Sequence, residues 1–207
     1  MRKAIQNQLP TASNLKRWGR SNTDSCRLCH RTQTNKHIFS NCSSANVLKR
    51  YTYGRNKILE ITSAWLRSSI TDQNIKMFAN LDSSPADDTC LVFHSFRPDM
   101  IFVGPGKTVT CLELTVCHES NLESSRARKV SKYNHLSSDL TDQFSGYVVQ
   151  KYFIEVTVLG FISDFTDFLK AMHVKCAPNS ILEQLSLFAI NLSQKIYWKR
   201  DNNDDLI

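Results

Sequence analysis

The chain has 207 residues, 41% of them hydrophobic, and a formal net charge of +7 at pH 7. This length accommodates one domain with a hydrophobic core and a small additional module. No apolar run is long enough to span a bilayer, and the first residues lack the apolar stretch of a secretory signal. We therefore expect no membrane contact and a reducing intracellular compartment, where the seven cysteines are metal ligands or core residues rather than disulfides.

The charge is unevenly distributed. Residues 1–57 carry twelve Lys and Arg but one acidic residue, Asp24, which gives a net charge of +11. Residues 58–207 carry fourteen Lys and Arg and eighteen Asp and Glu, which gives −4. A basic first quarter indicates either a module that binds a polyanion or a solvated basic surface. We predict two domains, 1–57 and 58–207.

In chain order, the first predicted element is a short basic helix within residues 1–20. Thr11 or Ser13 could cap it. Trp18 either packs in a core or stacks on a nucleobase, and the core is favoured because single helix aromatics are usually buried. A second helix is predicted over 43–69, interrupted at Gly54. Its expected buried positions are Val47, Tyr51, Ile58, Leu59, Ile61 and Trp65.

Strands are predicted next, at 90–93, 100–103 and 108–116, with Gly104-Pro105-Gly106-Lys107 as the turn between the last two. The remaining predicted elements are a helix at 121–140, a strand at 147–161 and helices near 163–174 and 179–197, the last beginning at Pro178. Leu122, Val130, Tyr133 and Leu136 are expected on the buried face of the 121–140 helix. This order predicts an α/β (α+β) fold, a mixed sheet flanked by helices.

Residues 22–42 form a polar, cysteine-rich segment with metal-ligand spacing. Cys26 and Cys29 form a Cys-x-x-Cys pair, and His37 and Cys42 follow it. Zinc takes four tetrahedral thiolate and imidazole ligands, and the intervening residues are too polar to form a core, so a metal would supply folding energy. We predict a structural zinc ion on these four residues. His30 is a rival to His37, and the alternative is three reduced cysteines without metal.

Basic residues surround this segment and favour contacts with a phosphate backbone. We predict that they bind nucleic acid. They are Lys16, Arg17, Arg20, Arg27, Arg31, Lys36, Lys49 and Arg50.

Two carboxylates occupy neighbouring predicted strands. Asp99 begins one strand, and Glu113 lies within the next on the same face as Cys111 and Thr115. A carboxylate within an apolar strand is costly unless a cation or hydrogen bonds satisfy it, and magnesium prefers such oxygen ligands. The sequence thus predicts a magnesium site. Alternatively, Pro-Asp is a common turn dipeptide, and Glu113 forms a salt bridge to a helix lysine.

The predicted helix after Glu113 presents cations at spacings of three to four residues, on one face. They are Arg126, Lys129 and Lys132, the last followed by Tyr133. A lysine beside a metal-bound water can orient the nucleophile or stabilise negative charge. The other interpretation is an exposed basic helix face.

Together these motifs resemble a known family: the C-terminal region of site-specific non-LTR retrotransposon reverse-transcriptase proteins, with a zinc knuckle (CCHC) and a restriction-like PD-(D/E)XK endonuclease. The matching stretches are CRLC…HIFSNC, RYTYGRNKIL, RPDMIF, LELTV and NLESSRARKVSKYNHL, which cover most of residues 9–160. The usual lysine two residues after the second acid is replaced by Thr115, but this family places its lysine on the helix. Gly54-Arg55-Asn56 departs from the Arg-His pair common there.

The resemblance implies catalytic roles for Asp99, Glu113, Lys129, Lys132 and Tyr133. It implies a catalytic magnesium on Asp99 and Glu113, with the Leu114 carbonyl as a further ligand. The expected function is nicking of target DNA in the nucleus, by a fragment of a polyprotein whose upstream reverse-transcriptase domain is missing here. Element RNA is a further expected partner. Other hypotheses are a catalytically inactive nucleic-acid-binding remnant and a structural zinc protein with a protein partner.

Overall fold

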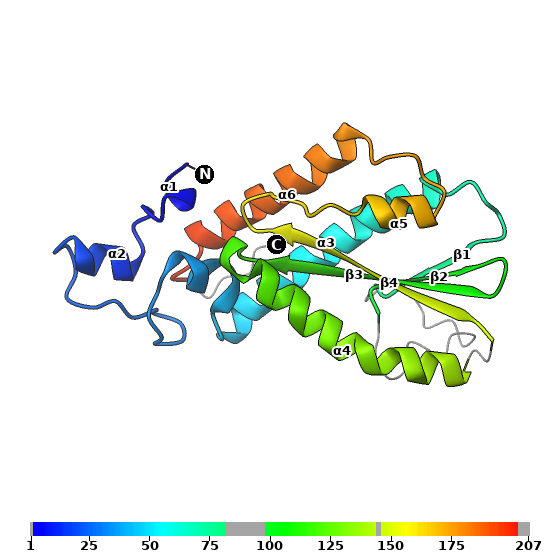
Figure 1. Cartoon of the computed structure of the whole chain (residues 1–207). Helices are drawn as coiled ribbons and strands as arrows, with labels where there is room; N and C mark the ends of the chain where they lie inside the picture. The colour runs from blue at the N-terminus through cyan, green and yellow to red at the C-terminus, as the bar shows by residue number, and fades with distance from the viewer. Residues whose placement is uncertain (1, 82–97, 144–145, 203–207) are drawn as a thin grey trace.

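A four-stranded sheet lies at the centre of the computed structural model, which describes residues 2–81, 98–143 and 146–202 (Figure 1). The strands are β1 (Lys76–Ala79), β2 (Met100–Gly104), β3 (Thr108–Cys117) and β4 (Val148–Thr157), in the order β1-β2-β3-β4. The pairs β1–β2 and β2–β3 are antiparallel, whereas β3 and β4 are parallel. A parallel pair requires a crossover, which helix α4 (Leu122–Gln143) provides.

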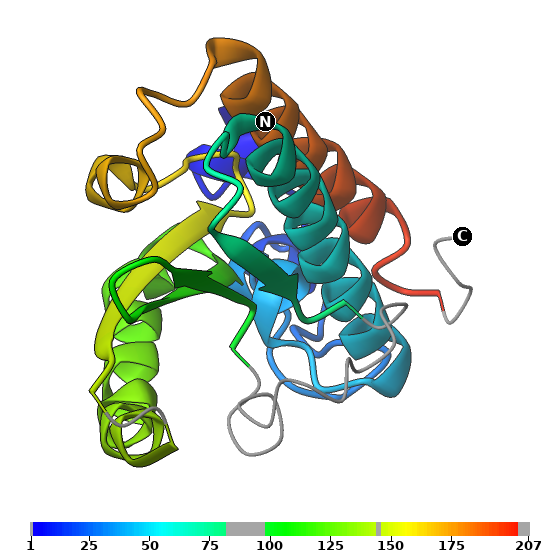
Figure 2. The ribbon, with the colours of Figure 1, turned by 90° about the vertical axis from the view of Figure 1, so that its right-hand side faces the viewer.

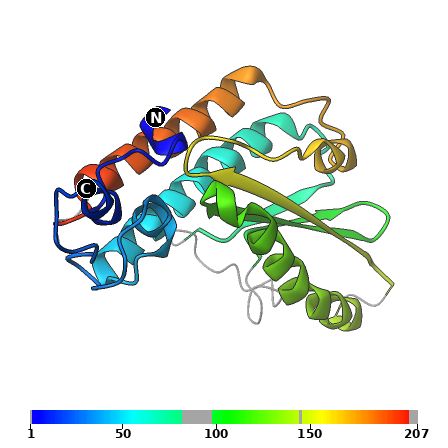
Figure 3. The ribbon, with the colours of Figure 1, turned by 60° about the vertical axis from the view of Figure 1, so that its left-hand side comes forward.

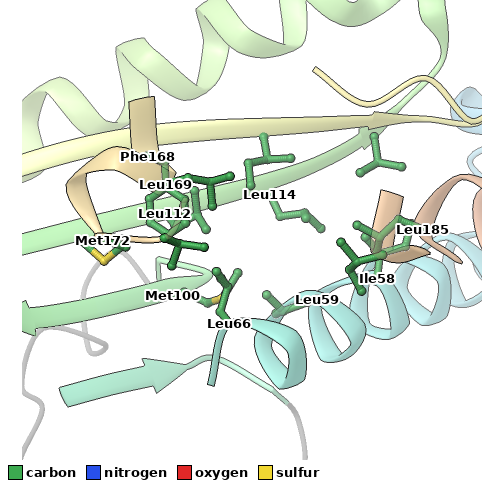
Figure 4. Packing of buried hydrophobic residues seen from close by; sticks show 14 of the residues in the cluster. Ile58, Leu59, Leu66, Met100, Leu112, Leu114, Phe168, Leu169, Met172 and Leu185 are labelled. Carbon is green, nitrogen blue, oxygen red and sulfur yellow. The ribbon is translucent and has the colours of Figure 1, made fainter. Parts of the chain in front are cut away.

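Helices cover both faces of this sheet (Figure 2). On one face lie α3 (Ala45–Ser69), α5 (Thr166–Ala171) and α6 (Asn179–Trp198), and on the other lies α4. Side chains alternate along β3, so Leu112 and Leu114 enter the larger core with Ile58, whereas Cys111 packs with Tyr133 of α4 (Figure 4). The predicted mixed sheet flanked by helices is therefore confirmed.

Helix α3 is continuous, so the predicted interruption at Gly54 is wrong. A Cβ at Gly54 would lie 2.2 Å from Leu192 Cδ2 of α6. The glycine therefore allows two long helices to pack closely, and tertiary contact outweighs its poor helix propensity. The predicted domain boundary at residue 57 also falls inside α3. The change of charge there is not a break in the fold.

The N-terminal segment packs against the C-terminal half of α6 (Figure 3). Ile38 and Phe39 share a hydrophobic cluster with Leu192 and Ile196. Ile38 and Phe39 lie in a short π-helix, η1 (His37–Asn41). The zinc segment and the sheet domain therefore share a core through α6.

Several predicted details are corrected. Residues 1–20 contain two short helices, α1 (Arg2–Ile5) and α2 (Ala12–Arg17), because Pro10 lies between them and Asn7 has a positive φ. Trp18 is 40% exposed rather than part of a core, and Val130 is also exposed. A short 3-10 helix, η3 (Glu119–Asn121), precedes α4.

The predicted strand 90–93 lies outside the described residues, and β1 at Lys76–Ala79 was not predicted. The predictions for β2, β3, β4, α5 and α6 differ from the structure only at their ends, as expected for boundaries read from sequence. Among the described residues, no helix combines the length and apolar character needed to cross a bilayer.

Candidate functional site

The four predicted zinc ligands converge near the N-terminus. One ligand atom from each of Cys26, Cys29, His37 and Cys42 lies within 4.8 Å of those of the other three. Cys29 Sγ and His37 Nε2 are 3.2 Å apart. His30 is exposed and stands outside the cluster. The structure therefore brings together the predicted set, with His37 rather than its rival His30.

Local backbone structure explains why these ligands meet. His30 N donates to Cys26 O at 2.9 Å, and His30 takes a positive φ that closes the turn carrying Cys26 and Cys29. The η1 π-helix holds His37, and Cys42 follows its end. Tyr51 of α3 fixes that end, because its hydroxyl donates to Ile38 O at 2.7 Å and accepts from Cys42 N at 3.3 Å.

Burial shifts the pKa of the ligand groups His37 and Cys42. Burial and the nearby Arg31 cation lower the pKa of His37, which favours the neutral imidazole that a metal requires. Burial raises the pKa of the Cys42 thiol to about 12. A thiolate at that position needs a compensating cation, and three sulfurs with one imidazole nitrogen are the ligand set that zinc prefers.

The two predicted carboxylates also meet, at the start of β2 and the middle of β3. The β2–β3 register pairs Met100 with Leu112, which places Asp99 beside Glu113. Asp99 N donates to Glu113 Oε1 at 3.1 Å, and Leu114 N donates to Asp99 Oδ2 at 2.8 Å. Both carboxylates are only 1% exposed. The backbone of β3 therefore holds the Asp99 carboxylate, and the backbone N–H of Asp99 holds the Glu113 carboxylate.

Cations from two different helices neutralise the buried pair. Lys129 Nζ of α4 donates to Glu113 Oε2 at 2.5 Å and lies 3.9 Å from Asp99 Oδ2. Arg55 of α3 forms an ion pair with Asp99 Oδ1. A buried charge without such a partner would be strongly unfavourable. Arg55 was not among the predicted site residues. It lies more than forty residues before Asp99 in the chain, so no sequence spacing indicated that the two side chains meet.

Tyr133 and Lys132 extend the cluster along α4. Tyr133 is fully buried, and its pKa is raised by burial and by the Glu113 carboxylate, so its phenol stays protonated. Lys132 Nζ lies 4.9 Å from the Tyr133 ring centroid and 3.4 Å from its hydroxyl. Of the two lysines, Lys129 is therefore the one in contact with the carboxylates.

A third buried carboxylate, Glu155 of β4, was not predicted. The parallel register pairs it with Thr115, on the face covered by α4, and Arg126 Nε lies 3.2 Å from its Oε1. The predicted helix cations therefore pair with different carboxylates: Arg126 with Glu155, and Lys129 with the Asp99–Glu113 pair.

Most of the predicted nucleic-acid-binding residues are accessible. Arg50 is the exception, because it is 3% exposed and its guanidinium donates to Lys199 O and Asn202 O, each at 2.8 Å. Arg50 joins α3 to the chain after α6, so its prediction as a nucleic-acid contact is wrong. The exposed residues are Lys16, Arg17, Arg20, Arg27, Arg31 and Lys49, and Lys36 is half-buried.

Comparison with known proteins bears on the N-terminal quarter. Residues 1–48 match the family described as zinc-binding in reverse transcriptase. This match and the four converging ligands together support zinc binding here and a relation to reverse-transcriptase proteins. The comparison with curated proteins finds no match.

Proposed function

We propose that the chain is a magnesium-dependent DNA endonuclease, a phosphodiester hydrolase that nicks DNA. The observation that carries the proposal is the pair Asp99 and Glu113, buried side by side with Lys129. The order α3-β1-β2-β3-α4-β4 is the one expected for a PD-(D/E)XK restriction-like core, and it supports this assignment. The sequence resemblance assigns Asp99 and Glu113 to the metal-binding acids of such a core.

The donor set fits magnesium. Asp99 and Glu113 offer carboxylate oxygens and Leu114 a backbone carbonyl, and magnesium selects hard oxygen ligands while retaining several waters. When bound, the ion would lower the pKa of a bound water and stabilise charge on the phosphate. Since Leu114 N already donates to Asp99, the backbone of β3 orients the first carboxylate toward the second.

Lys129 has the role of charge stabilisation. Its ammonium is within reach of both carboxylates, and with magnesium held by Asp99 and Glu113 it would be available to stabilise charge on a phosphate oxygen. Tyr133 keeps its proton beside Glu113, so it can position that carboxylate by hydrogen bonding. Lys132 packs on the ring and supports Tyr133.

Residues 1–48, which match the zinc-binding family and which we call the zinc module, would bind the target DNA. Element RNA is a second polyanion with the same chemistry. The exposed cations Arg17, Arg20, Arg27 and Arg31 supply this affinity through counterion release. Within a retrotransposon protein, such a module and nuclease would act in the nucleus, downstream of a reverse-transcriptase domain.

A second candidate function is nucleic-acid binding without catalysis. It is favoured by one observation, that Arg55 and Lys129 already compensate the carboxylates with protein cations. A catalytically inactive remnant would retain this arrangement as a purely structural ion-pair network.

Nicking of supercoiled plasmid distinguishes the two functions. The wild-type protein should convert plasmid to the open circle with Mg²⁺ and not with a chelator. Asp99→Asn and Glu113→Gln keep the size and an acceptor oxygen but remove the charge, so each should reduce nicking at least about a thousandfold. Asp167→Asn is the matched control, since Asp167 is exposed on α5. Magnesium-independent nicking, or none by the folded wild type, would contradict the endonuclease proposal.

A further inference from the structure

Three clefts share lining residues in series, from Arg31 on the zinc module to Lys129 on α4. The first, of about 400 Å³, lies on the zinc module beside Arg31 and Lys36 and ends at Asn41. The second, of about 340 Å³, begins at Asn41 and runs to the first turns of α4. The third, of about 270 Å³, shares Ser40 and Thr115 with the second. We call these three clefts together the track.

The third cleft of the track lies beside the cations of the proposed metal site. Its third cleft is lined by Arg55 and Lys129, the two cations paired with Asp99 and Glu113. Thr115 of β3, two residues after Glu113, forms part of the floor of the second and third clefts. A chain that followed the track from the zinc module would therefore arrive at the two cations that pair with the buried carboxylates.

Charge along the track has one sign. Arg31 and Lys36 line the first cleft, Arg128 the second, and Arg55 and Lys129 the third. Among the described residues, no acidic side chain lines any of the three clefts, although residues 58–207 are net acidic. The remaining polar lining of the second cleft consists mainly of hydroxyls and amides, which donate hydrogen bonds to phosphate oxygens.

We infer that the track binds the sugar–phosphate backbone of one DNA strand and leads it from the zinc module to the metal site. The inference rests on the proposed function for the identity of the nucleic acid. Clefts of about 270 to 400 Å³ have the size of small-ligand sites, which matches single nucleotides of an unpaired strand.

Two substitutions on the track have matched partners elsewhere. Asn41→Asp adds one negative charge where two clefts meet and keeps the oxygen that accepts from Ser40 Oγ. Its control is Asn191→Asp, the same change at an exposed position of α6. Arg128→Ala removes a cation from the second cleft, and Lys195→Ala removes an exposed one from α6. All four sites are exposed, so the variants should fold, which zinc content and melting temperature will verify.

The test is fluorescence anisotropy of the full chain with a labelled 20-nucleotide DNA single strand, in Ca²⁺ so that no cleavage occurs. Asn41→Asp and Arg128→Ala should each weaken binding about fivefold to tenfold, and Arg128→Ala should reduce the salt slope by roughly 0.7, the value for one contact to a single-strand phosphate. The two controls should change binding less than about twofold, since they lie outside the track.

The outcomes separate this inference from the endonuclease proposal. Equal binding by the track and control variants overturns the track, even if magnesium-dependent nicking is intact. A selective loss for the track variants supports the track, even if the wild type shows no nicking. A selective loss with an RNA strand of the same sequence, and none with DNA, overturns the assignment to DNA.

Discussion

The zinc module and the sheet both bury polar side chains, but they offset the cost in different ways. In the zinc module, Cys26, His37 and Cys42 are buried with no protein cation bound to the sulfurs among the described contacts. In the sheet, Asp99 and Glu113 are equally buried but have Arg55 and Lys129 as counterions. We infer that the zinc site needs its ion in order to fold, whereas the carboxylate pair, compensated by protein cations, would fold without the magnesium that we propose for it.

This difference explains why two metals would have two roles in one small chain. Thiolates and a neutral imidazole hold zinc in a closed coordination sphere, which contributes folding energy. Carboxylates backed by mobile lysine and arginine side chains leave room for water and substrate, as catalysis with magnesium requires. The sheet site should therefore tolerate loss of its metal, and the zinc site should not.

Removing zinc should have the largest effect. Cys29→Ser deletes one ligand, and structural zinc contributes about 10–16 kcal/mol of apparent binding free energy in small modules. Residues 22–42 should unfold, and the end of α6 should loosen because Ile38 and Phe39 pack on Leu192 and Ile196. Metal analysis should find about one zinc per wild-type chain and much less in the variant, and hydrogen exchange should show β2 and β3 still protected.

Cys176→Ser is the control for this experiment, since Cys176 is exposed and outside the cluster. If metal analysis found no zinc in the wild-type protein, the contrast between a zinc site and a carboxylate site would be wrong. Simultaneous loss of protection in β3 would show that the two regions fold as one unit.

Lys129→Ala should have the next largest effect. It removes the cation nearest both carboxylates, so nicking should fall by about 10²–10³, as for loss of one transition-state donor. Stability should fall as well, because Glu113 is left buried without its partner. Adding Glu113→Gln should restore the free energy of unfolding but not nicking. Lys132→Ala should matter less, and the reverse order in plasmid assays would transfer the catalytic role to Lys132.

Gly54→Ala probes the contact that joins the two regions through α3 and α6. Helix propensity alone predicts stabilisation by about 1 kcal/mol. The added Cβ, however, would meet Leu192 Cδ2 at 2.2 Å, and overpacking costs about 1–3 kcal/mol. We expect net destabilisation of at most about 1 kcal/mol in urea unfolding, since Leu192 Cδ2 must rotate away from the added Cβ. In a Leu192→Ala background the same substitution should become neutral or stabilising, and stabilisation in the wild-type background would show that the helices separate readily.

The two regions also differ in how much the sequence could predict. Zinc ligands lie within seventeen residues, so their spacing alone identified the set that converges. Strand alternation across one turn placed the carboxylates on neighbouring strands. Helical spacing placed Arg126, Lys129 and Lys132 on one helix face, and the family resemblance singled out Lys129. Arg55 and Glu155 were missed, because their partners Asp99 and Arg126 are distant in sequence and only the packing of α3 and α4 on the sheet brings them together.

Arg50 and Trp18 were misassigned for a related reason. Residue type suggests exposure for arginine and burial for tryptophan. Arg50 is instead buried where it donates to two carbonyl groups after α6, and Trp18, at the C-cap of α2, is 40% exposed. Strand β1 was missed because four residues contain too little alternation to distinguish a strand from a loop.

The smallest expected effect concerns the cap of α2, which tests how far the zinc module depends on local backbone structure besides its metal. Thr11 is fully buried, and its hydroxyl accepts from Asn14 N at 3.2 Å. Thr11→Val keeps the shape and removes the acceptor, so it should cost about 1 kcal/mol of stability. Ser13→Ala, at the other candidate cap, should cost less, because Thr11 and not Ser13 is the observed cap. Thermal melting of the zinc-loaded protein should resolve the two, and equal losses would show that the hydroxyl of Thr11 does not hold the helix.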